Sequence, residues 1–353
     1  MSDGAPKVVR VDANALTGFT AGILEHAGVP GAQATLWAES LVWANLRGID
    51  SHGVLRVPRY LELITSGEIN PRPEMKTLVQ QGAVALLDAD RAPGPVGMGR
   101  AVELAIERAR EAHVGWCSAR GITHAGAIGA LTLQISEAGL VGIVMTASRP
   151  LMAYHGSRDP VLSTNPIAIA VPASRRDPLV LDMSTATVAL GKIMSARRTG
   201  EPLGEGWALD QNGAPTTDPE AAATLTPMAG PKGSGLSLMI ECLASLVAGN
   251  PVISAALGGA TGSNMNGAVI ALDPGAFGPM EGFLDNVDAL VDAVHAQATG
   301  DRTDRLLMPG ERGRIEKAAR EKNGIPLPPK VWSDLLTAAE RANVPPPELM
   351  GAS

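Results

Sequence analysis

The chain has 353 residues, of which 45% are hydrophobic and 18% are charged. This is enough apolar material for one large or two ordinary domains, with a mainly aliphatic core because aromatic residues make up only 3%. The net charge is −7 and no basic cluster is longer than Arg197-Arg198, so we do not expect nucleic acid as a partner.

Membrane and metal partners are not expected either. No apolar run approaches the roughly 20 residues of a membrane span, and the first residues lack the apolar region of a signal peptide. Cys117 and Cys242 lie far apart without metal-ligand spacing, which indicates buried thiols in a reducing cytoplasm. The six histidines are dispersed, so no metal site is predicted.

Helical spacing dominates both ends of the chain and strands dominate its middle. The first part predicts helices over 12–27, 32–46 and 53–66. The middle predicts strands over 84–87, 114–117, 141–145, 167–171, 179–183 and 268–272, with helices over 99–112, 126–139 and 233–248. The end predicts helices over 282–298, 312–323 and 330–342.

We therefore expect an α/β (α+β-like) fold with two domains. Residues 1–72 with 300–353 would form a helical domain, and 73–299 a mixed α/β domain, with a break near the prolines of 70–73. A Rossmann site is rejected, because the glycines of 94–99 fall in the wrong order and the next strand ends without an acid.

A serine, a histidine and an arginine come together at Ser51, His52 and Arg56. The hydroxyl can orient the imidazole, and the arginine, one helical turn on if a helix starts at Gly53, can hold a carboxylate. This combination suits redox or addition chemistry at the carbon beside an acid group. The alternative is that Ser51 and His52 only cap the helix and Arg56 is a surface charge.

Two glycine-rich stretches, 121–129 and 229–235, each open a predicted helix and offer bare backbone N–H groups where a phosphate is favoured. Lys232 adds a charge to the second. Polar residues at 163–166 and 182–185 lie at strand ends, where sites gather. Ordinary helix starts and turn chemistry are the alternatives for each, and Lys192 alone is typical of a solvated lysine.

Together these stretches resemble the malate/L-lactate dehydrogenase family that is distinct from the Rossmann-type enzymes. Its members include malate, sulfolactate and ureidoglycolate dehydrogenases, a diketogulonate reductase and reductases of cyclic imino acids. The matching segments, in the family's order from residue 47 to about 328, are RGIDSHGVLRVPRYLELITSGEINPRP, THAGAIGA, DPVLSTNPIAIAVP, LVLDMSTATVALGKI, EGWALDQNGAPTTDP, AGPKGSGLSLMIECL, and MPGER with the following NGIPLP.

The resemblance implies NAD or NADP bound on a mixed sheet of non-Rossmann type, usually in a homodimer with the cofactor near the subunit interface. In the family pattern His52 is the proton donor, Ser51 assists it and Arg56 binds the substrate carboxylate. In ureidoglycolate dehydrogenase-like members the histidine matching His124 is itself proposed as the proton acceptor. We favour His52, because Arg56 places the substrate beside it.

Further roles are implied by the same resemblance. Thr164 matches a substrate-side threonine. The cofactor contacts would fall on His124, Ala125, Gly126, Ala127, Ile128, Asp182, Met183, Ser184, Pro231, Lys232, Pro309, Gly310 and Glu311. Lys192 stands where the imino-acid reductases carry an aspartate. An ammonium there would stabilise alkoxide character on a substrate oxygen, and would suit an already positive iminium less well. Residues 250–267 match no member.

The expected function is therefore an NAD(P)-dependent oxidoreductase that interconverts a 2-hydroxy acid and a 2-oxo acid, of malate, lactate, sulfolactate or ureidoglycolate type. The first alternative is an NADPH-dependent reductase of cyclic imino acids, acting on a C=N bond. The second is a catalytically inactive nucleotide-binding protein, against which the joint presence of Ser51, His52, Arg56 and Lys192 argues.

Overall fold

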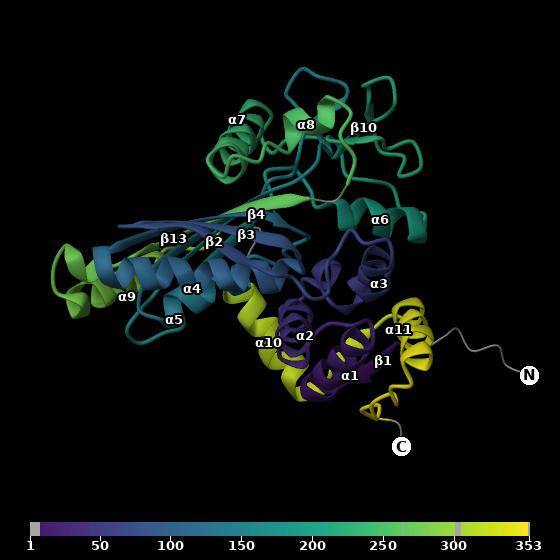
Figure 1. Ribbon diagram of the computed structural model, residues 1–353, viewed down its shortest axis with the longest axis horizontal. Helices are drawn as coiled ribbons and strands as arrows, with labels where there is room; N and C mark the ends of the chain where they lie inside the picture. Colours follow the sequence, from purple (N-terminus) through teal and green to yellow (C-terminus); the bar gives the residue numbers. More distant parts are fainter. Residues whose placement is uncertain (1–7, 263, 301–304, 352–353) are drawn as a thin grey trace, which may run out of the picture.

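The structure is a computed structural model that describes residues 8–262, 264–300 and 305–351. It contains a seven-stranded mixed sheet, a helical unit built from both ends of the chain, and a small five-stranded sheet on the opposite side of the large sheet from that unit (Figure 1). The predicted mixed α/β fold class is confirmed.

The large sheet has the order β2-β3-β4-β13-β5-β8-β9. Only β3 and β4 are parallel, because helix α4 connects them, and every other pair is antiparallel. This order differs from a doubly wound parallel sheet, in line with the rejected Rossmann fingerprint. The strands are β2 (Lys76–Gln81), β3 (Val84–Ala92), β4 (Val114–Ile122), β5 (Val141–Ala147), β8 (Ile167–Val171), β9 (Leu179–Met183) and β13 (Met265–Leu272).

Helices cover both faces of this sheet. Helices α4 (Gly94–Ala112) and α5 (Gly129–Glu137) contact one face, whereas α7 (Pro231–Glu241) and the π-helical turn Cys242–Leu246 contact the other. The two layers bury most of the central strands β4, β5 and β13, which accounts for their apolar sequences, whereas the edge strand β2 is exposed. Cys117 is buried as expected, but Cys242 is only partly buried.

The two ends of the chain pack into one helical unit. Strand β1 (Val9–Val11) pairs with β14 (Ile325–Leu327), and a shared apolar cluster includes Leu16, Trp37 and Leu335. Its helices are α1 (Ala13–His26), α2 (Gly31–Leu46), α3 (Val57–Thr65), α10 (Glu311–Asn323) and α11 (Pro329–Ala342). The domain limits at 72/73 and 299/300 stay a prediction, and 1–7, 301–304 and 352–353 lie outside the described residues.

The small sheet has the order β11-β10-β12-β6-β7 and its own apolar cluster. Its strands have only two or three residues, too few for an alternating pattern, so the sequence analysis does not anticipate them. The strands are β6 (Met152–Ala153), β7 (Pro160–Leu162), β10 (Ala208–Leu209), β11 (Pro215–Thr216) and β12 (Thr224–Leu225), packed with α6 (Leu190–Thr199) and α8 (Ile253–Leu257). Helix α9 (Met280–His295) lies at the far end of the large sheet (Figure 1).

The predicted helix over 53–66 is wrong in its first part. Two short 3₁₀ turns, Asp50–His52 and Val54–Arg56, precede α3, which begins at Val57. Pro58 explains the difference, because it has no N–H to donate and is tolerated only in the first turn of a helix. Among the described residues, none of the helices combines the length and apolar character that crossing a membrane requires.

Candidate active site

The turn that carries Ser51 and His52 is held against α2 by Asn45. The buried Asn45 side chain accepts a hydrogen bond from the Val54 N–H at 2.9 Å. A Cβ atom at Gly53 would lie 2.2 Å from the Asn45 amide oxygen, so glycine is needed for this approach. The D-S-H-G stretch therefore requires its glycine for packing.

Asp50 holds the same turn from the other side. Asn45 donates to one Asp50 carboxylate oxygen at 2.6 Å, and Arg320 of α10 donates to both oxygens at 2.7 and 3.0 Å. A bidentate arginine fixes orientation as well as distance. The C-terminal part of the chain thus positions the residue next to Ser51.

Two imidazole rings lie face to face at the centre of the site. The rings of His52 and His124 are stacked, with 5.4 Å between centroids and 23° between planes. The Ser51 Oγ lies 2.9 Å from Nδ1 of His52. The Tyr60 hydroxyl lies 2.8 Å from Nδ1 of His124, and the Gly126 N–H donates to that nitrogen at 3.3 Å. The two histidines that sequence analysis leaves in competition are therefore neighbours.

Arg56 is the charged residue, outside the pair itself, that lowers the pKa values of both imidazoles. Burial and, secondarily, the Arg56 charge lower the pKa of His52 to about 4. The same causes, with His52 added, hold the pKa of His124 well below its usual range. Burial raises the pKa of Tyr60 to about 12, against the opposing effect of Arg56. Both imidazoles are thus neutral near pH 7. Arg56 itself donates through Nε to the carbonyl oxygen of Ser51 at 2.7 Å.

Helix α6 brings Lys192 to the edge of the turn. A Cβ atom at Gly191 would lie 2.6 Å from Cβ of Ser51, so the first turn of α6 packs against the serine only because residue 191 is glycine. Lys192 is the next residue and is exposed. The glycine in the family segment ALGKI therefore has a packing reason.

Asp182, near the end of β9, contacts the start of α5. The Asp182 carboxylate accepts a hydrogen bond from the Gly129 N–H at 2.8 Å. Burial raises the pKa of Asp182 to about 6, although this hydrogen bond acts in the opposite direction. The Ser184 hydroxyl donates to the Thr164 carbonyl at 3.3 Å, which links the end of β9 to the segment that precedes β8. Met183, between Asp182 and Ser184, is partly buried.

The start of α7 packs against the same strand end. The Met228 N–H donates to the Thr185 carbonyl at 2.9 Å, and a Cβ atom at Gly233 would lie 2.6 Å from that oxygen. Pro231 and Lys232 are exposed at the first turn of the helix. The structure therefore brings the second glycine-rich stretch close to Ser184.

The segment Pro309-Gly310-Glu311 lies along β9. The Val180 N–H donates to the Pro309 carbonyl at 3.1 Å. Gly310 has a φ of +90°, a conformation that favours glycine, and packs against Val180. This contact places the segment two residues from Asp182 along the strand.

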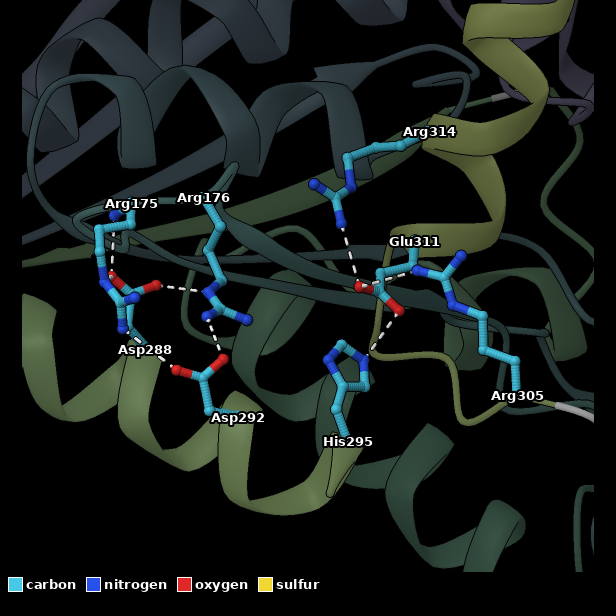
Figure 2. Close-up of polar contacts among 8 residues, drawn as sticks. All are labelled: Arg175, Arg176, Asp288, Asp292, His295, Arg305, Glu311 and Arg314. Atoms are coloured by element: carbon cyan, nitrogen blue, oxygen red, sulfur yellow. Dashed lines mark hydrogen bonds and ion pairs between the residues drawn. The ribbon is translucent and has the colours of Figure 1, made fainter. Parts of the chain in front are cut away.

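The Glu311 side chain is turned into the protein and is 6% exposed. Its carboxylate accepts from the Met308 N–H at 2.9 Å and pairs with His295 and Arg314 at 3.2 and 3.3 Å (Figure 2). Burial tends to raise its pKa, but these hydrogen bonds and charges outweigh burial and the pKa is lowered. Glu311 is therefore an anchor of the segment.

A cavity of about 590 Å³ opens between the helical unit and the sheet. It lies between α2, α5, β9 and α10, and its wall includes Asp182, Gly310 and Arg47. This volume is in the usual range of small-molecule sites. Ile49, three residues before His52, also lines it, so the cavity runs beside the segment that leads to the imidazole pair.

The structure brings together Ser51, His52, Arg56 and His124, and separately Asp182, Gly129 and Pro309-Gly310. The alternative in which Ser51 and His52 only cap a helix does not hold, because they lie in a 3₁₀ turn before α3, which has no side-chain cap. In the described part of the chain, no group of histidine, cysteine and carboxylate side chains could hold a metal ion.

Sequence reasoning misses four contributors to the site. Asn45, Tyr60 and Arg320 act across 5 to 270 residues of chain, and no local pattern marks them. Gly94 is part of the rejected Rossmann-like stretch. A Cβ atom there would lie 2.1 Å from the His124 carbonyl oxygen, so this glycine lets α4 support the His124 loop.

The fold and the site define a class of α/β protein that differs from the doubly wound dinucleotide-binding folds, with paired imidazoles where two structural units meet. The sequence profile described as malate/L-lactate dehydrogenase matches residues 11–336. The chain belongs to this family, as the resemblance predicts.

Curated relatives agree with this assignment. The chain is 35% identical to a malate dehydrogenase of Pyrococcus horikoshii over 347 residues, covering 95% of this chain and 96% of the relative. It is 33% identical to an NAD(+) ureidoglycolate dehydrogenase of Escherichia coli O157:H7, covering 89% of this chain and 91% of the relative. It is 34% identical to an NADP(+) (2R)-3-sulfolactate dehydrogenase of Chromohalobacter salexigens, covering 88% and 92%.

Solved structures share the whole fold. The malate dehydrogenase of Pyrococcus horikoshii OT3 superposes with a TM-score of 0.87 at 32% identity, covering 98% of this chain and 99% of that one. A delta1-piperideine-2-carboxylate reductase from Pseudomonas syringae has a TM-score of 0.83 at 29% identity, covering 94% and 99%. The fold therefore occurs with both hydroxy-acid and imine chemistry.

Proposed function

We propose that this chain is an NAD(P)-dependent oxidoreductase that interconverts a 2-hydroxy acid and a 2-oxo acid. The observation that carries the proposal is the stacked pair His52 and His124 beside Arg56. Two neutral imidazoles next to a cation that can bind a carboxylate provide a proton acceptor, a hydrogen-bond donor and an anchor for an acid substrate.

The hydrogen bonds of His124 define its tautomer. The Gly126 N–H donates to Nδ1, so that nitrogen carries a lone pair, and the Tyr60 hydroxyl must donate to it as well. A neutral imidazole has one ring proton, which in His124 is then on Nε2. His124 is therefore a hydrogen-bond donor toward a substrate oxygen.

His52 has the opposite arrangement. Its Nδ1 faces the Ser51 hydroxyl, which can accept a proton from the ring. With the proton on Nδ1, the lone pair of Nε2 is free to take a proton. We therefore assign His52 as the base of oxidation and His124 as the donor that orients the substrate oxygen, which gives different roles to the two competing histidines.

Arg56 and Lys192 act on the substrate in this mechanism. Thr164 is a further residue on the substrate side, as the family resemblance implies. In oxidation Arg56 binds the carboxylate of the hydroxy acid, and Nε2 of His52 takes the hydroxyl proton as the C2–H bond breaks. Charge that develops on the oxygen is stabilised by His124 and by the ammonium of Lys192. In the reverse direction protonated His52 returns the proton to the carbonyl oxygen.

A nicotinamide dinucleotide held here would provide the hydride acceptor for C2 in oxidation and the hydride donor in reduction. The residues fit such a group. The cavity of about 590 Å³ has Asp182 and Gly310 in its wall. In addition, Nη1 of Arg47 is buried without a hydrogen-bond partner among the described residues, as expected for a group that awaits an anionic ligand. Thr164 and Ser184, with Pro231 and Lys232 at the start of α7, are the further cofactor- and substrate-side residues that the family resemblance implies.

The proposal includes a homodimer that works in the cytoplasm. Large apolar side chains are exposed along α7 and the π-helical turn, at Met239 (55%), Leu246 (52%) and Val247 (58%). A contiguous apolar face of this kind favours association with another protein surface. Sedimentation of the purified chain at micromolar concentration tests this part of the proposal.

A second candidate is the reduction of cyclic imino acids, because a solved imine reductase shares the fold. Lys192 disfavours it, since an ammonium repels a positively charged iminium. The two candidates are separated by one assay, the loss of nicotinamide absorbance with NADH and with NADPH. Its substrates are pyruvate, oxaloacetate, phenylpyruvate, sulfopyruvate, oxalurate and a cyclic imino acid.

We expect turnover of at least one oxo acid. Turnover of the imine alone would contradict the hydroxy-acid proposal. In that case Lys192→Asp should raise imine turnover further. If Lys192→Asp abolished it, the assigned role of residue 192 would be wrong.

A further inference from the structure

The cavity between α2, α5, β9 and α10 has an unusual distribution of unpaired charge. Eight charged residues line it. Arg314 is paired with Asp177 at 2.8 Å and Lys317 with Glu321 at 3.1 Å. Among the described residues, Arg47 and Arg312 have no carboxylate partner, so they are the cations of the wall that are available to a ligand.

The guanidinium of Arg47 is oriented by its neighbours, but it forms no ion pair with the described residues. Its guanidinium lies 4.3 Å from the centroid of the Trp43 ring, which fixes the plane of the group, and the carboxylates of Asp177 and Glu321 act on it only from beyond ion-pair distance. Its Nη1 atom is buried and makes no hydrogen bond in the described part of the chain. A buried donor without a partner costs free energy, which a ligand oxygen would recover.

The remaining carboxylates of the wall are Glu137 and Asp182. Glu137 is exposed at the end of α5. Asp182 uses one oxygen, Oδ2, to accept the Gly129 N–H, and its other oxygen can accept from a sugar hydroxyl. The wall therefore combines an acceptor on β9 with two unpaired guanidinium groups on α2 and α10.

We propose that this cavity binds the adenosine end of the dinucleotide and that Arg47 and Arg312 bind a phosphate on its 2′-oxygen, which makes the enzyme selective for NADP over NAD. This inference rests on the proposed function. Planar guanidinium groups match phosphate oxygens, and a nearby arginine is the usual means of accepting the 2′-phosphate.

The test measures binding of adenosine nucleotides by calorimetry, without any turnover. The probes are adenosine 2′,5′-bisphosphate, its 3′,5′ isomer of equal charge, and AMP. We expect the 2′,5′-bisphosphate to bind at least about tenfold more tightly than the other two, because two charge-assisted contacts are added. Equal affinity of AMP and the 2′,5′-bisphosphate would overturn the proposal.

Variants locate the phosphate. Arg312→Gln changes an exposed side chain and should not affect folding, and Arg47→Met should keep the stacking volume on Trp43. Each should lose about tenfold in affinity for the 2′,5′-bisphosphate and little for AMP. Lys322→Gln, on the same helix but outside the cavity, is the matched control and should change neither. Glu137→Gln should tighten the 2′,5′-bisphosphate, because a like charge leaves the wall.

The two proposals fail in different ways. Selective binding of the 2′,5′-bisphosphate without turnover of any oxo acid or imine would contradict the proposed reaction and leave the phosphate site intact. Turnover with NADH, together with no preference for the 2′,5′-bisphosphate, would support the reaction and overturn the phosphate site. Loss of affinity in Lys322→Gln equal to that in Arg312→Gln would also overturn it, since only general charge would then matter.

Discussion

In two polar clusters of this molecule, burial combines differently with neighbouring charges to set the pKa values of the buried groups. Around His52 and His124 the main neighbouring charge is Arg56, which has the same sign as a protonated imidazole, so burial and charge both lower the pKa values. Between the β8–β9 connection and α9, Asp288 is fully buried. Burial pushes its pKa up, but the Arg175 N–H and the guanidinium of Arg176 outweigh this and the pKa is lowered (Figure 2).

The comparison shows what separates a reactive group from a structural one. Asp288 accepts the Arg175 N–H at 2.8 Å and pairs with Arg176, while the adjacent Asp292 pairs with both arginines at 3.1 and 2.7 Å. Every charge there is compensated, so the cluster joins α9 to the sheet. No opposite charge from the described residues acts on the imidazole pair, which remains neutral and available for proton transfer.

The largest kinetic effect is expected for Arg56, because its charge both binds the substrate and lowers the pKa of His52. Arg56→Gln should raise KM for the hydroxy acid about hundredfold, because the carboxylate loses a charged anchor. The same change should raise the pKa of His52, since a cation that lowers it is removed. Steady-state kinetics at saturating cofactor provides the measurement. Arg59→Gln, exposed in the next turn, is the control, and an unchanged KM in Arg56→Gln would show that the carboxylate binds elsewhere.

A smaller effect on kcat is expected when His124 loses the hydrogen bond from Tyr60 that fixes its tautomer. Tyr60→Phe removes the 2.8 Å hydrogen bond to Nδ1 and leaves only the longer one from Gly126. We expect kcat to fall about tenfold with little change in KM. The ring ¹⁵N shifts of His124 should then report a mixture of tautomers, which loss of packing alone would not produce. Unchanged shifts and kcat would mean that Tyr60 has no positioning role.

The pH dependence follows from the lowered pKa of His52. Oxidation needs neutral His52, and with a pKa of about 4 the ring is neutral throughout pH 5–7. At saturating cofactor, kcat/KM for oxidation should therefore change less than about twofold between pH 7 and 5 and fall below that. Reduction needs protonated His52, so it should become faster as the pH falls. Because Asp182 has a pKa of about 6, an acid limb of oxidation near pH 6.5 that persists in Asp182→Asn would mean an ordinary histidine.

The smallest effect on turnover is expected from a change in the ion-pair cluster of Arg175, Arg176, Asp288 and Asp292. Asp288→Asn removes the charge that pairs with Arg176, so the melting temperature should fall by several degrees while kcat and KM remain within about twofold of the wild-type values. Thermal unfolding and kinetics on one preparation test both parts. A large loss of kcat in the folded variant would mean that the α9 cluster acts on the site.

Much of the fold could be predicted because its signals are local. The strands over 167–171 and 179–183 coincide with β8 and β9, and the helices at both ends agree to within a few residues. The small sheet could not be predicted, since strands of two or three residues have no periodicity. The apolar spacing misplaces the start of α3, because Pro58 fits only the first turn of a helix.

The candidate site was predictable only where it is contiguous in sequence. Ser51, His52 and Arg56 lie within six residues, so their association is visible in the chain. The Tyr60–His124 hydrogen bond spans 64 residues and the Arg320–Asp50 pair spans 270, and only the folded chain reveals them. The tautomer of His124 depends on the first of these contacts, so sequence alone leaves the two histidines in competition.

The central claim is the division of roles between His52 and His124, and one pair of variants tests it most directly. Glutamine keeps an N–H donor near the position of Nε2 but cannot serve as a base. We predict that His52→Gln lowers kcat of hydroxy-acid oxidation about a thousandfold, the usual contribution of a general base. His124→Gln should lower it no more than about tenfold. The reverse order, with His124→Gln inactive and His52→Gln nearly as fast as the wild type, would contradict the account.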